Sequence, residues 1–167
     1  MLIIRRLEPN DAEAVSALFA QSWRFAYKGI VGDAYLNTLQ DSHWTAFLTQ
    51  HLNNGLMGIA LEADGIMIGA CLIRRSSACC YPDDGELLAI YLHPDFIGAG
   101  HGHMLYGAVE VAMREEGYTH CIVNVLTENA RAVHFYEDHG FERTAHTEKA
   151  VLGGQELECV TMRKGLR

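Results

Sequence analysis

The chain has 167 residues, of which 49% are hydrophobic, and its formal net charge is −8. This length and apolar content suit one folded domain over residues 1–167 and exclude a disordered chain. The acidic balance argues against nucleic acid and anionic membranes as partners, since clustered Lys and Arg bind both, but it is compatible with a cationic substrate as well as with simple solubility.

The first half of the chain predicts two helices among three strands. Apolar residues recur at helical spacing after residue 12, and glycines at 29 and 32 interrupt that pattern. In chain order we expect a strand (Leu2–Leu7), a helix capped by Asn10 or Asp11, a second helix from about Asp33 to Leu52, and two strands (Leu56–Glu62 and Ile66–Arg74) joined by an Ala63-Asp64-Gly65 turn.

The second half predicts two further helices, each followed by strand. The segment Glu86–Leu92 is nearly all apolar, as a central buried strand would be. After it we expect a loop (Gly98–Gly102), a helix to about Glu116, a strand (His120–Leu126), a helix (Asn129–His139) closed by Gly140, and two strands near Phe141–Val151 and Gln155–Arg163. This order predicts a mixed α/β fold with one layer of sheet and helices on its faces.

The five cysteines lack the number and spacing of a disulfide framework or a zinc site. Their number is odd, Cys79 and Cys80 are adjacent, and no C-x-x-C pair occurs, so we expect reduced thiols and no zinc site. Polar residues follow Arg5 and Arg6 where a signal peptide would be apolar, and the longest apolar run, Ile66–Ile73, is too short to span a bilayer. We therefore expect a cytoplasmic protein.

The glycine-rich loop predicts an anion site. Gly98, Gly100 and Gly102 lie between a buried strand and a helix, where backbone N–H groups and the helix dipole favour negative charge. A dinucleotide site is the rival interpretation, with Glu128 as the ribose-binding acid. The G-x-G-x-G spacing and the late position of the loop, which leaves too few βαβ units, count against that rival.

Two segments of this sequence resemble the acetyltransferases of the GNAT family. Residues 92–102 (LHPDFIGAGHG) resemble the family's loop for the pyrophosphate of acetyl-CoA, and residues 129–141 (NARAVHFYEDHGF) resemble its second conserved segment, in the same order and spacing. The opening residues 4–11 are also similar. The resemblance implies a single, mostly antiparallel twisted sheet of about seven strands flanked by about four helices. It also implies transfer of the acetyl group of acetyl-CoA, as co-substrate, to a primary amine of a small acceptor by direct attack in a ternary complex.

The resemblance assigns the cofactor to the central strand, the loop and the helix after it. The backbone of the strand, if bulged, would bind the pantetheine arm and the oxyanion, and Asn129 would contact the arm or cap its own helix, or both. The family usually has Gln or Arg where this chain has Ile97, so a side-chain donor to the pyrophosphate is missing, and His101 and His103 could add charge at low pH. The cofactor-binding residues expected on this basis are Ile90, Tyr91, Leu92, Ile97, Gly98, Ala99, Gly100, His101, Gly102, His103 and Asn129.

Acetyl transfer to an amine needs proton transfers. An alkyl ammonium group has a pKa near ~10.4 and must lose a proton, the oxyanion needs a donor, and a leaving thiol of pKa about 8.5 benefits from an acid. Tyr136 is the candidate acid, because the family places a tyrosine near the sulfur there; the alternative is a core aromatic. Glu86 is the candidate base, through a water; the alternative is a solvated residue at a strand start.

Trp23, Arg24 and Tyr27 are the expected acceptor-binding residues, because the family's acceptor site lies near the end of the first helix. Residues 23–36 are similar to a bacterial subgroup that includes polyamine acetyltransferases, although core packing is the alternative role of Trp23. We therefore expect a small acceptor with a primary amine, polyamine-like on this resemblance, while aminoglycosides, amino acids and protein N-termini also present such an amine. Late strands of such folds can pair into a homodimer. The alternative function is a catalytically idle acyl-CoA-binding or regulatory module, which Ile97 favours and which Tyr136 and Glu86 argue against.

Overall fold

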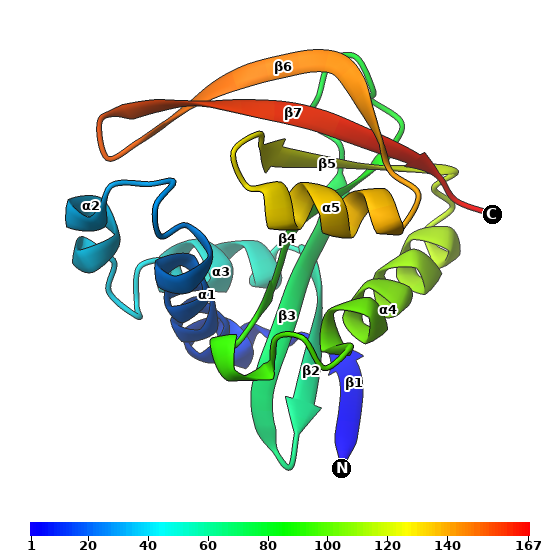
Figure 1. Ribbon diagram of the computed structural model, residues 1–167. Coiled ribbons are helices and arrows are strands. Elements are labelled where there is room, and N and C mark those ends of the chain that lie inside the picture. The colour runs from blue at the N-terminus through cyan, green and yellow to red at the C-terminus, as the bar shows by residue number, and fades with distance from the viewer.

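One seven-stranded sheet organises the molecule in the computed structural model, which describes residues 1–167 (Figure 1). The strands lie in the order β1-β2-β3-β4-β5-β7-β6. Their bounds are β1 Leu2–Arg6, β2 Met57–Ala63, β3 Ile66–Arg75, β4 Gly85–Leu92, β5 His120–Leu126, β6 Glu142–Leu152 and β7 Gln155–Gly165. The helices are α1 Ala12–Ala26, α2 Asp33–Thr38, α3 Thr45–Asn53, α4 His101–Glu115 and α5 Ala130–Asp138, with short 3-10 turns at Pro9–Asp11 and Pro94–Phe96. The predicted mixed α/β fold with a mostly antiparallel seven-stranded sheet is confirmed.

The sheet opens between β4 and β5. These two strands pair in parallel through only two residue pairs, Gly85 with Cys121 and Glu86 with Ile122, whereas every other neighbouring pair is antiparallel. Beyond Glu86, β4 continues its pairing with β3 alone and β5 continues its pairing with β7 alone. The two strands therefore diverge, and a gap opens in the middle of the sheet.

A bulge in β4 accompanies this divergence. Ile73 of β3 pairs with Leu87, and Leu72 pairs with Ala89, so Leu88 is the extra residue. A bulge bends its strand and increases the local twist, which redirects the side chains and amides that follow. The bulge that the resemblance implies is therefore present.

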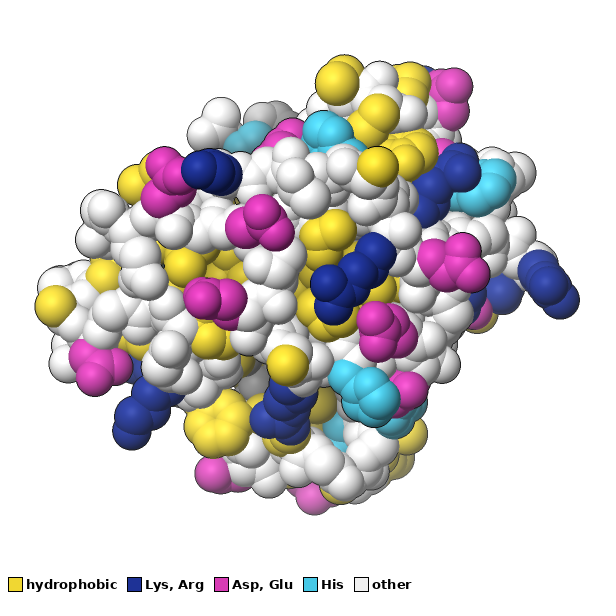
Figure 2. Space-filling model, turned by 45° about the horizontal axis from the view of Figure 1, so that its top comes forward, with side chains coloured by type: hydrophobic (Ala, Val, Ile, Leu, Met, Phe, Trp, Pro, Cys, Tyr) yellow, Lys and Arg dark blue, Asp and Glu magenta, His cyan; other side chains and the backbone are white.

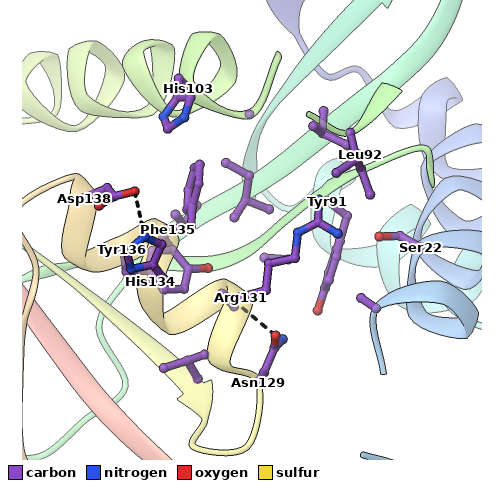
Figure 3. Close-up of a pocket in the computed structure, with 18 of the residues that line it drawn as sticks. Ser22, Tyr91, Leu92, His103, Asn129, Arg131, His134, Phe135, Tyr136 and Asp138 are labelled. Atoms are coloured by element: carbon purple, nitrogen blue, oxygen red, sulfur yellow. Dashed lines mark hydrogen bonds and ion pairs between the residues drawn. The ribbon is translucent and has the colours of Figure 1, made fainter. Parts of the chain in front are cut away.

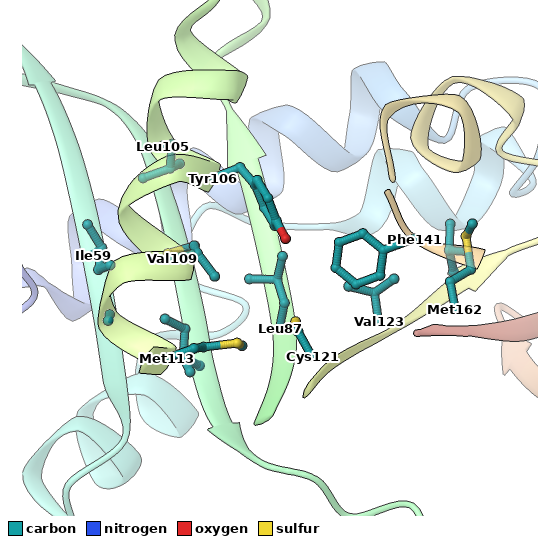
Figure 4. Packing of buried hydrophobic residues seen from close by; sticks show 14 of the residues in the cluster. Ile59, Leu87, Leu105, Tyr106, Val109, Met113, Cys121, Val123, Phe141 and Met162 are labelled. Carbon is teal, nitrogen blue, oxygen red and sulfur yellow. The ribbon is translucent and has the colours of Figure 1, made fainter. Parts of the chain in front are cut away.

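Apolar helix faces cover both sides of the sheet. On one side, α4 packs Leu105, Val109 and Met113 against strand residues that include Ile59 and Leu87 (Figure 4). On the other side, α1 and α3 pack against β3 in a cluster made of Ala12, Val15, Leu18, Phe19, Leu48, Leu52, Ala70 and Leu72. Because helices cover both faces of the sheet, the central strand β4 can be apolar along nearly its whole length, as its sequence predicted.

The second predicted helix is wrong in its extent. The structure has two helices, α2 and α3, in place of one over Asp33–Leu52. Ser16 of α1 lies at the break, where its hydroxyl donates to the carbonyl of Asp41 (2.6 Å) and accepts from the N–H of Trp44 (2.9 Å). A side chain from another helix thus satisfies the backbone groups that a continuous helix would pair internally.

The β6–β7 hairpin reaches across to the segment between α1 and α2. The side-chain amide of Gln155 donates to the carbonyl of Ile30 and accepts from the N–H of Gly32, each at 3.2 Å. The N–H groups of Ile30 and Val31 in turn donate to the carbonyl of Tyr27. The end of the hairpin therefore holds the C-terminal end of α1 in place.

We expect Gly153→Ala to destabilise the fold more than Gly154→Ala. Both glycines have positive φ, 58° and 78°, where a Cβ costs about 1–2 kcal/mol. A Cβ at Gly153 would also lie 2.6 Å from Cβ of Tyr35, whereas one at Gly154 would meet nothing within 4 Å. The clash should add about 1–3 kcal/mol, measured as the free energy of unfolding in urea. Equal losses in the two variants would contradict the docking of the hairpin on α2.

The surface carries charges of both signs. Figure 2 shows acidic, basic and histidine side chains scattered over one face, with apolar side chains between them and no continuous block of one charge. No helix combines the length and the apolar character that crossing a membrane requires.

Candidate functional site

The gap between β4 and β5 contains a cavity of about 400 Å³. Its walls come from α1, β4, β5, the glycine loop with the start of α4, and α5. Figure 3 shows Ser22, Tyr91, His103 and Tyr136 entering it from four of these elements. Segments that are far apart in the sequence therefore share one cavity, because the sheet is open at this point.

The glycine loop presents unpaired backbone donors. The first backbone hydrogen bond of α4 runs from the N–H of Met104 to the carbonyl of Gly100 (3.1 Å), and the N–H groups of residues 98–103 have no acceptor in the protein. Gly100 caps the helix with φ +83° and lines the cavity, and a Cβ there would meet nothing within 4 Å. These donors and the helix dipole suit a pyrophosphate.

Most of the predicted cofactor residues line this cavity. Ala99 and His101 do not, and the ring of His101 instead bonds through Nδ1 to the carbonyl of Phe96 (3.0 Å), which closes the loop on itself. His103 lines the cavity, and its Nδ1 lies 2.8 Å from Nε2 of His139. Burial and then the charge of His103 lower the pKa of His139, so this pair resists carrying two protons. The lining members of the predicted set are Ile90, Tyr91, Leu92, Ile97, Gly98, Gly100, Gly102, His103 and Asn129.

The backbone of β4 offers two of its amides to the gap. The N–H of His93 donates to the carbonyl of Ile68 (2.8 Å), which makes these two a hydrogen-bonded pair of the antiparallel ladder. Because such pairs alternate, Tyr91 is also paired with β3, whereas the N–H groups of Ile90 and Leu92 point away from β3 toward the gap. Ile90 and Leu92 are thus the amides that a ligand in the gap can reach.

Two polar side chains of α5 face the cavity. Asn129 caps the helix, since its Oδ1 accepts from the N–H of Ala132 (3.2 Å), while its Nδ2 makes no hydrogen bond within the protein. Tyr136 packs its ring edge-on against Phe135 and Phe141, and its hydroxyl also has no partner in the protein. Burial, and then the neighbouring Tyr91, raise the pKa of Tyr136 above its ordinary value. Tyr136 is therefore a protonated hydroxyl available to a ligand.

Glu86 does not line the cavity. Its side chain is buried at the apex of the gap, where Oε2 accepts from Nε of Arg74 (2.6 Å) and Oε1 accepts from Nδ2 of Asn124 (3.1 Å). Asn124 does line the cavity and lies beside it. The structure brings Tyr136 to the cavity, but it separates Glu86 from the cavity by the Asn124 side chain.

One of the three predicted acceptor residues lines the cavity. The hydroxyl of Tyr27 lies 3.1 Å from that of Tyr91, and burial raises the pKa of both. Trp23 packs between Tyr27 and Trp44, with ring centroids 4.6 and 5.2 Å away, as its alternative core role implies.

Arg24 turns away from the cavity. One guanidinium nitrogen donates to the carbonyl of Leu39 (2.6 Å) and to the carboxylate of Asp41 (2.9 Å). Its observed contacts therefore hold α1 against the connection between α2 and α3, and it does not reach the wall that Tyr27 forms.

Sequence reasoning missed several residues that line the cavity. Asn124 is the one polar residue in the apolar run from Cys121 to Leu126, the same signal that drew attention to Glu86. Arg131 lies within the resembling segment, and its guanidinium sits 6.0 Å from the ring centroid of Phe25 on α1, across the mouth of the cavity. The remaining missed polar residues are Ser22, His134 and Asp138.

Comparisons with known proteins agree with this geometry. The pattern of the Acetyltransferase (GNAT) family matches residues 16–141. Spermidine N(1)-acetyltransferase of Thermoplasma acidophilum is 24% identical over 145 residues, which cover 83% of this chain and 87% of that relative. The PaiA N-acetyltransferase of the same organism, solved in complex with coenzyme A, matches with a TM-score of 0.74 at 22% identity and covers 99% of both chains. The structure of yncA from Salmonella typhimurium with its cofactor acetyl-CoA matches with a TM-score of 0.74 at 19% identity, covering 100% of this chain and 95% of that one.

Proposed function

The chain belongs to the GNAT acetyltransferase family, and we propose that it acetylates a primary amine of a small acceptor, such as a polyamine, by direct attack in a ternary complex. It is an acyl-CoA-dependent N-acetyltransferase, and acetyl-CoA is its co-substrate. The observation that carries the proposal is the single cavity in the gap between β4 and β5, which joins the glycine loop to the wall around Tyr27. Two substrates that enter from opposite sides of the sheet would meet there.

The chain has groups that fit each part of acetyl-CoA. The unpaired N–H groups of residues 98–103 suit the pyrophosphate, and Nδ2 of Asn129 with the amides of Ile90 and Leu92 suits the pantetheine arm. The same β4 amides can also donate to the carbonyl oxygen as negative charge develops on it. The walls of β4 and α5 thereby hold the thioester and activate it.

Tyr136 supplies the acid in this proposal. Its hydroxyl would donate a proton to the departing sulfur and then regain one from solvent or from the newly acylated nitrogen. Burial keeps the hydroxyl protonated at neutral pH, and the lack of an internal partner leaves it available. Glu86 would act as a base only through an intervening water, because Asn124 separates it from the cavity.

A polyamine acceptor rests on two observations. The relative that is 24% identical is named for acetylating spermidine, and the net charge of −8 attracts a polycation toward the surface. We expect the acceptor to enter beside Tyr27, on the face of the sheet that α1 covers.

Calorimetry followed by an acceptor screen tests the proposal. We expect micromolar binding of acetyl-CoA, none of NAD, and release of coenzyme A thiol with spermidine or spermine together with an acetylated product by mass spectrometry. Amino acids, aminoglycosides and peptides with free N-termini complete the panel. Turnover of only peptides would contradict the small-acceptor proposal, and binding of NAD in place of acetyl-CoA would contradict the assignment of the loop.

Ile97→Arg should tighten the binding of acetyl-CoA. Ile97 lines the cavity beside the loop, at the position where the family usually has a side-chain donor. One charge-assisted hydrogen bond to a phosphate corresponds to a dissociation constant about tenfold lower, and the gain should shrink as salt is added. Ile97→Leu is the matched control and should bind as the wild type does. No gain at low salt would mean that this position does not reach the phosphates.

A further inference from the structure

Asn124 is held from two sides while it lines the cavity. Its Nδ2 donates to Oε1 of Glu86 (3.1 Å), and its Oδ1 accepts from the hydroxyl of Thr161 (2.7 Å). A carboxylate can only accept, so the nitrogen of the amide must face Glu86, and the oxygen must face Thr161. This orientation leaves one N–H and one lone pair of Asn124 for a ligand in the cavity.

The network of Glu86, Asn124 and Thr161 lies where β4 and β5 separate. Glu86 pairs with Ile122 in the last residue pair that joins β4 to β5. Asn124 lies two residues further along β5, on the same face of the sheet, and pairs with Thr161 of β7. Asn124 is therefore the first side chain on this face of β5 beyond the point where the gap opens.

Glu86 is buried beside Asn124 and does not line the cavity. The residue is 3% exposed, and each carboxylate oxygen already accepts a hydrogen bond, one from Arg74 and one from Asn124. Because Glu86 does not line the cavity, an acceptor amine bound there can reach its carboxylate only through Asn124 or a water. A carboxylate in such a site is better suited to fix its neighbour than to take up a proton in each turnover.

We infer that Asn124 binds the acceptor amine and that Glu86 is a positioning residue that acts through Asn124. An N–H of the amine donates to the free lone pair of Oδ1, which holds the nitrogen at the end of the gap that faces the thioester. The ammonium proton leaves to solvent before attack. This inference rests on the proposed function, and it assigns the charge of Glu86 to orientation and the acceptor contact to a residue of β5.

Three variants test the inference with polyamine turnover and acetyl-CoA calorimetry. Asn124→Ala should raise the acceptor KM about tenfold or more while the Kd of acetyl-CoA stays within twofold. Thr161→Val keeps the side-chain shape but removes the hydroxyl that donates to Asn124, so it should raise the same KM severalfold. This variant tests the inference even if Asn124→Ala folds poorly. Asn53→Ala, which removes an exposed amide far from the cavity, is the control and should match the wild type.

Glu86→Gln separates a positioning role from a basic one. As a positioning variant it keeps an acceptor for Nδ2 of Asn124, so kcat/KM should fall severalfold with an unchanged dependence on pH. A fall in kcat of about a hundredfold or more, with loss of an ionisation from the pH profile, would identify Glu86 as the base and overturn the inference. An unchanged acceptor KM in folded Asn124→Ala would overturn it as well. Wild-type protein that turns over no amine would instead contradict the proposed function itself.

Discussion

Tyr136→Phe lowers kcat about a hundredfold at pH 7 and leaves the Kd of acetyl-CoA within twofold, if the hydroxyl is the acid of acetyl transfer. Phenylalanine preserves the edge-on packing against Phe135 and Phe141, so the change removes only an oxygen that has no partner in the protein. The hydroxyl stands in the cavity, and burial keeps it protonated. The loss should therefore fall on the chemical step and not on binding.

The dependence on pH gives this prediction a second readout. The sulfur of the tetrahedral intermediate carries no proton and can leave as a thiolate at any pH, so an acid accelerates its departure without being strictly required. Because burial keeps the hydroxyl of Tyr136 protonated well above neutral pH, the defect of Tyr136→Phe should stay constant between pH 7 and about 9, when measured as thiol release under saturating acceptor. Tyr118→Phe, a tyrosine that packs against the core and does not line the cavity, is the control. Full activity of Tyr136→Phe at pH 7 would remove Tyr136 from the mechanism.

Gly100→Asp should weaken acetyl-CoA binding by at least about a hundredfold. A carboxylate would then stand beside the unpaired N–H groups of the loop, at a position that lines the cavity. Two like charges about 4 Å apart repel by about 4 kcal/mol near a protein surface, more than a hundredfold loss requires. Asp tolerates positive φ better than most residues, so the fold should persist.

The chain offers a matched control for this charge. Gly55 also has positive φ, +92°, and a Cβ there would meet nothing within 4 Å, but it lies in the turn after α3 and does not line the cavity. Gly55→Asp should cost similar stability in urea unfolding and leave the calorimetric Kd of acetyl-CoA unchanged. Equal binding by the two variants would mean that the loop at Gly100 does not hold the phosphates.

Features set by neighbouring residues could be predicted well from the sequence. β5 spans the predicted His120–Leu126, the turn between β2 and β3 lies within the predicted Ala63–Gly65, and α4 begins at His101, inside the predicted Gly98–Gly102 loop. Each of these features depends on side chains a few positions apart: the apolar pattern of a strand, the residues of a turn or the cap of a helix. The glycine loop belongs to this class, because consecutive residues of one loop and one helix end build it. The family resemblance, now confirmed, rests on the same kind of local segment.

The features that were predicted wrongly or not at all depend on contacts between residues that are far apart in the sequence. The break between α2 and α3 is decided by Ser16, which lies 25 residues before the carbonyl that it binds. Asn124 obtains its orientation from Glu86 and Thr161, 38 and 37 residues away. The approach of Tyr27 to Tyr91 joins residues 64 positions apart. No local sequence pattern predicts these contacts, because they form only when the strands assemble into the sheet.

The sequence by itself therefore determined the class of fold, the glycine loop, Tyr136 on its helix and the family. Only the tertiary structure decided that β4 and β5 part after Glu86, which of the polar residues reach the resulting cavity, and that Glu86 lies behind Asn124 and not in the open. The physical reason is that backbone hydrogen bonds and caps are satisfied within a few residues, whereas the burial and pairing of a side chain depend on the packed surfaces of distant elements.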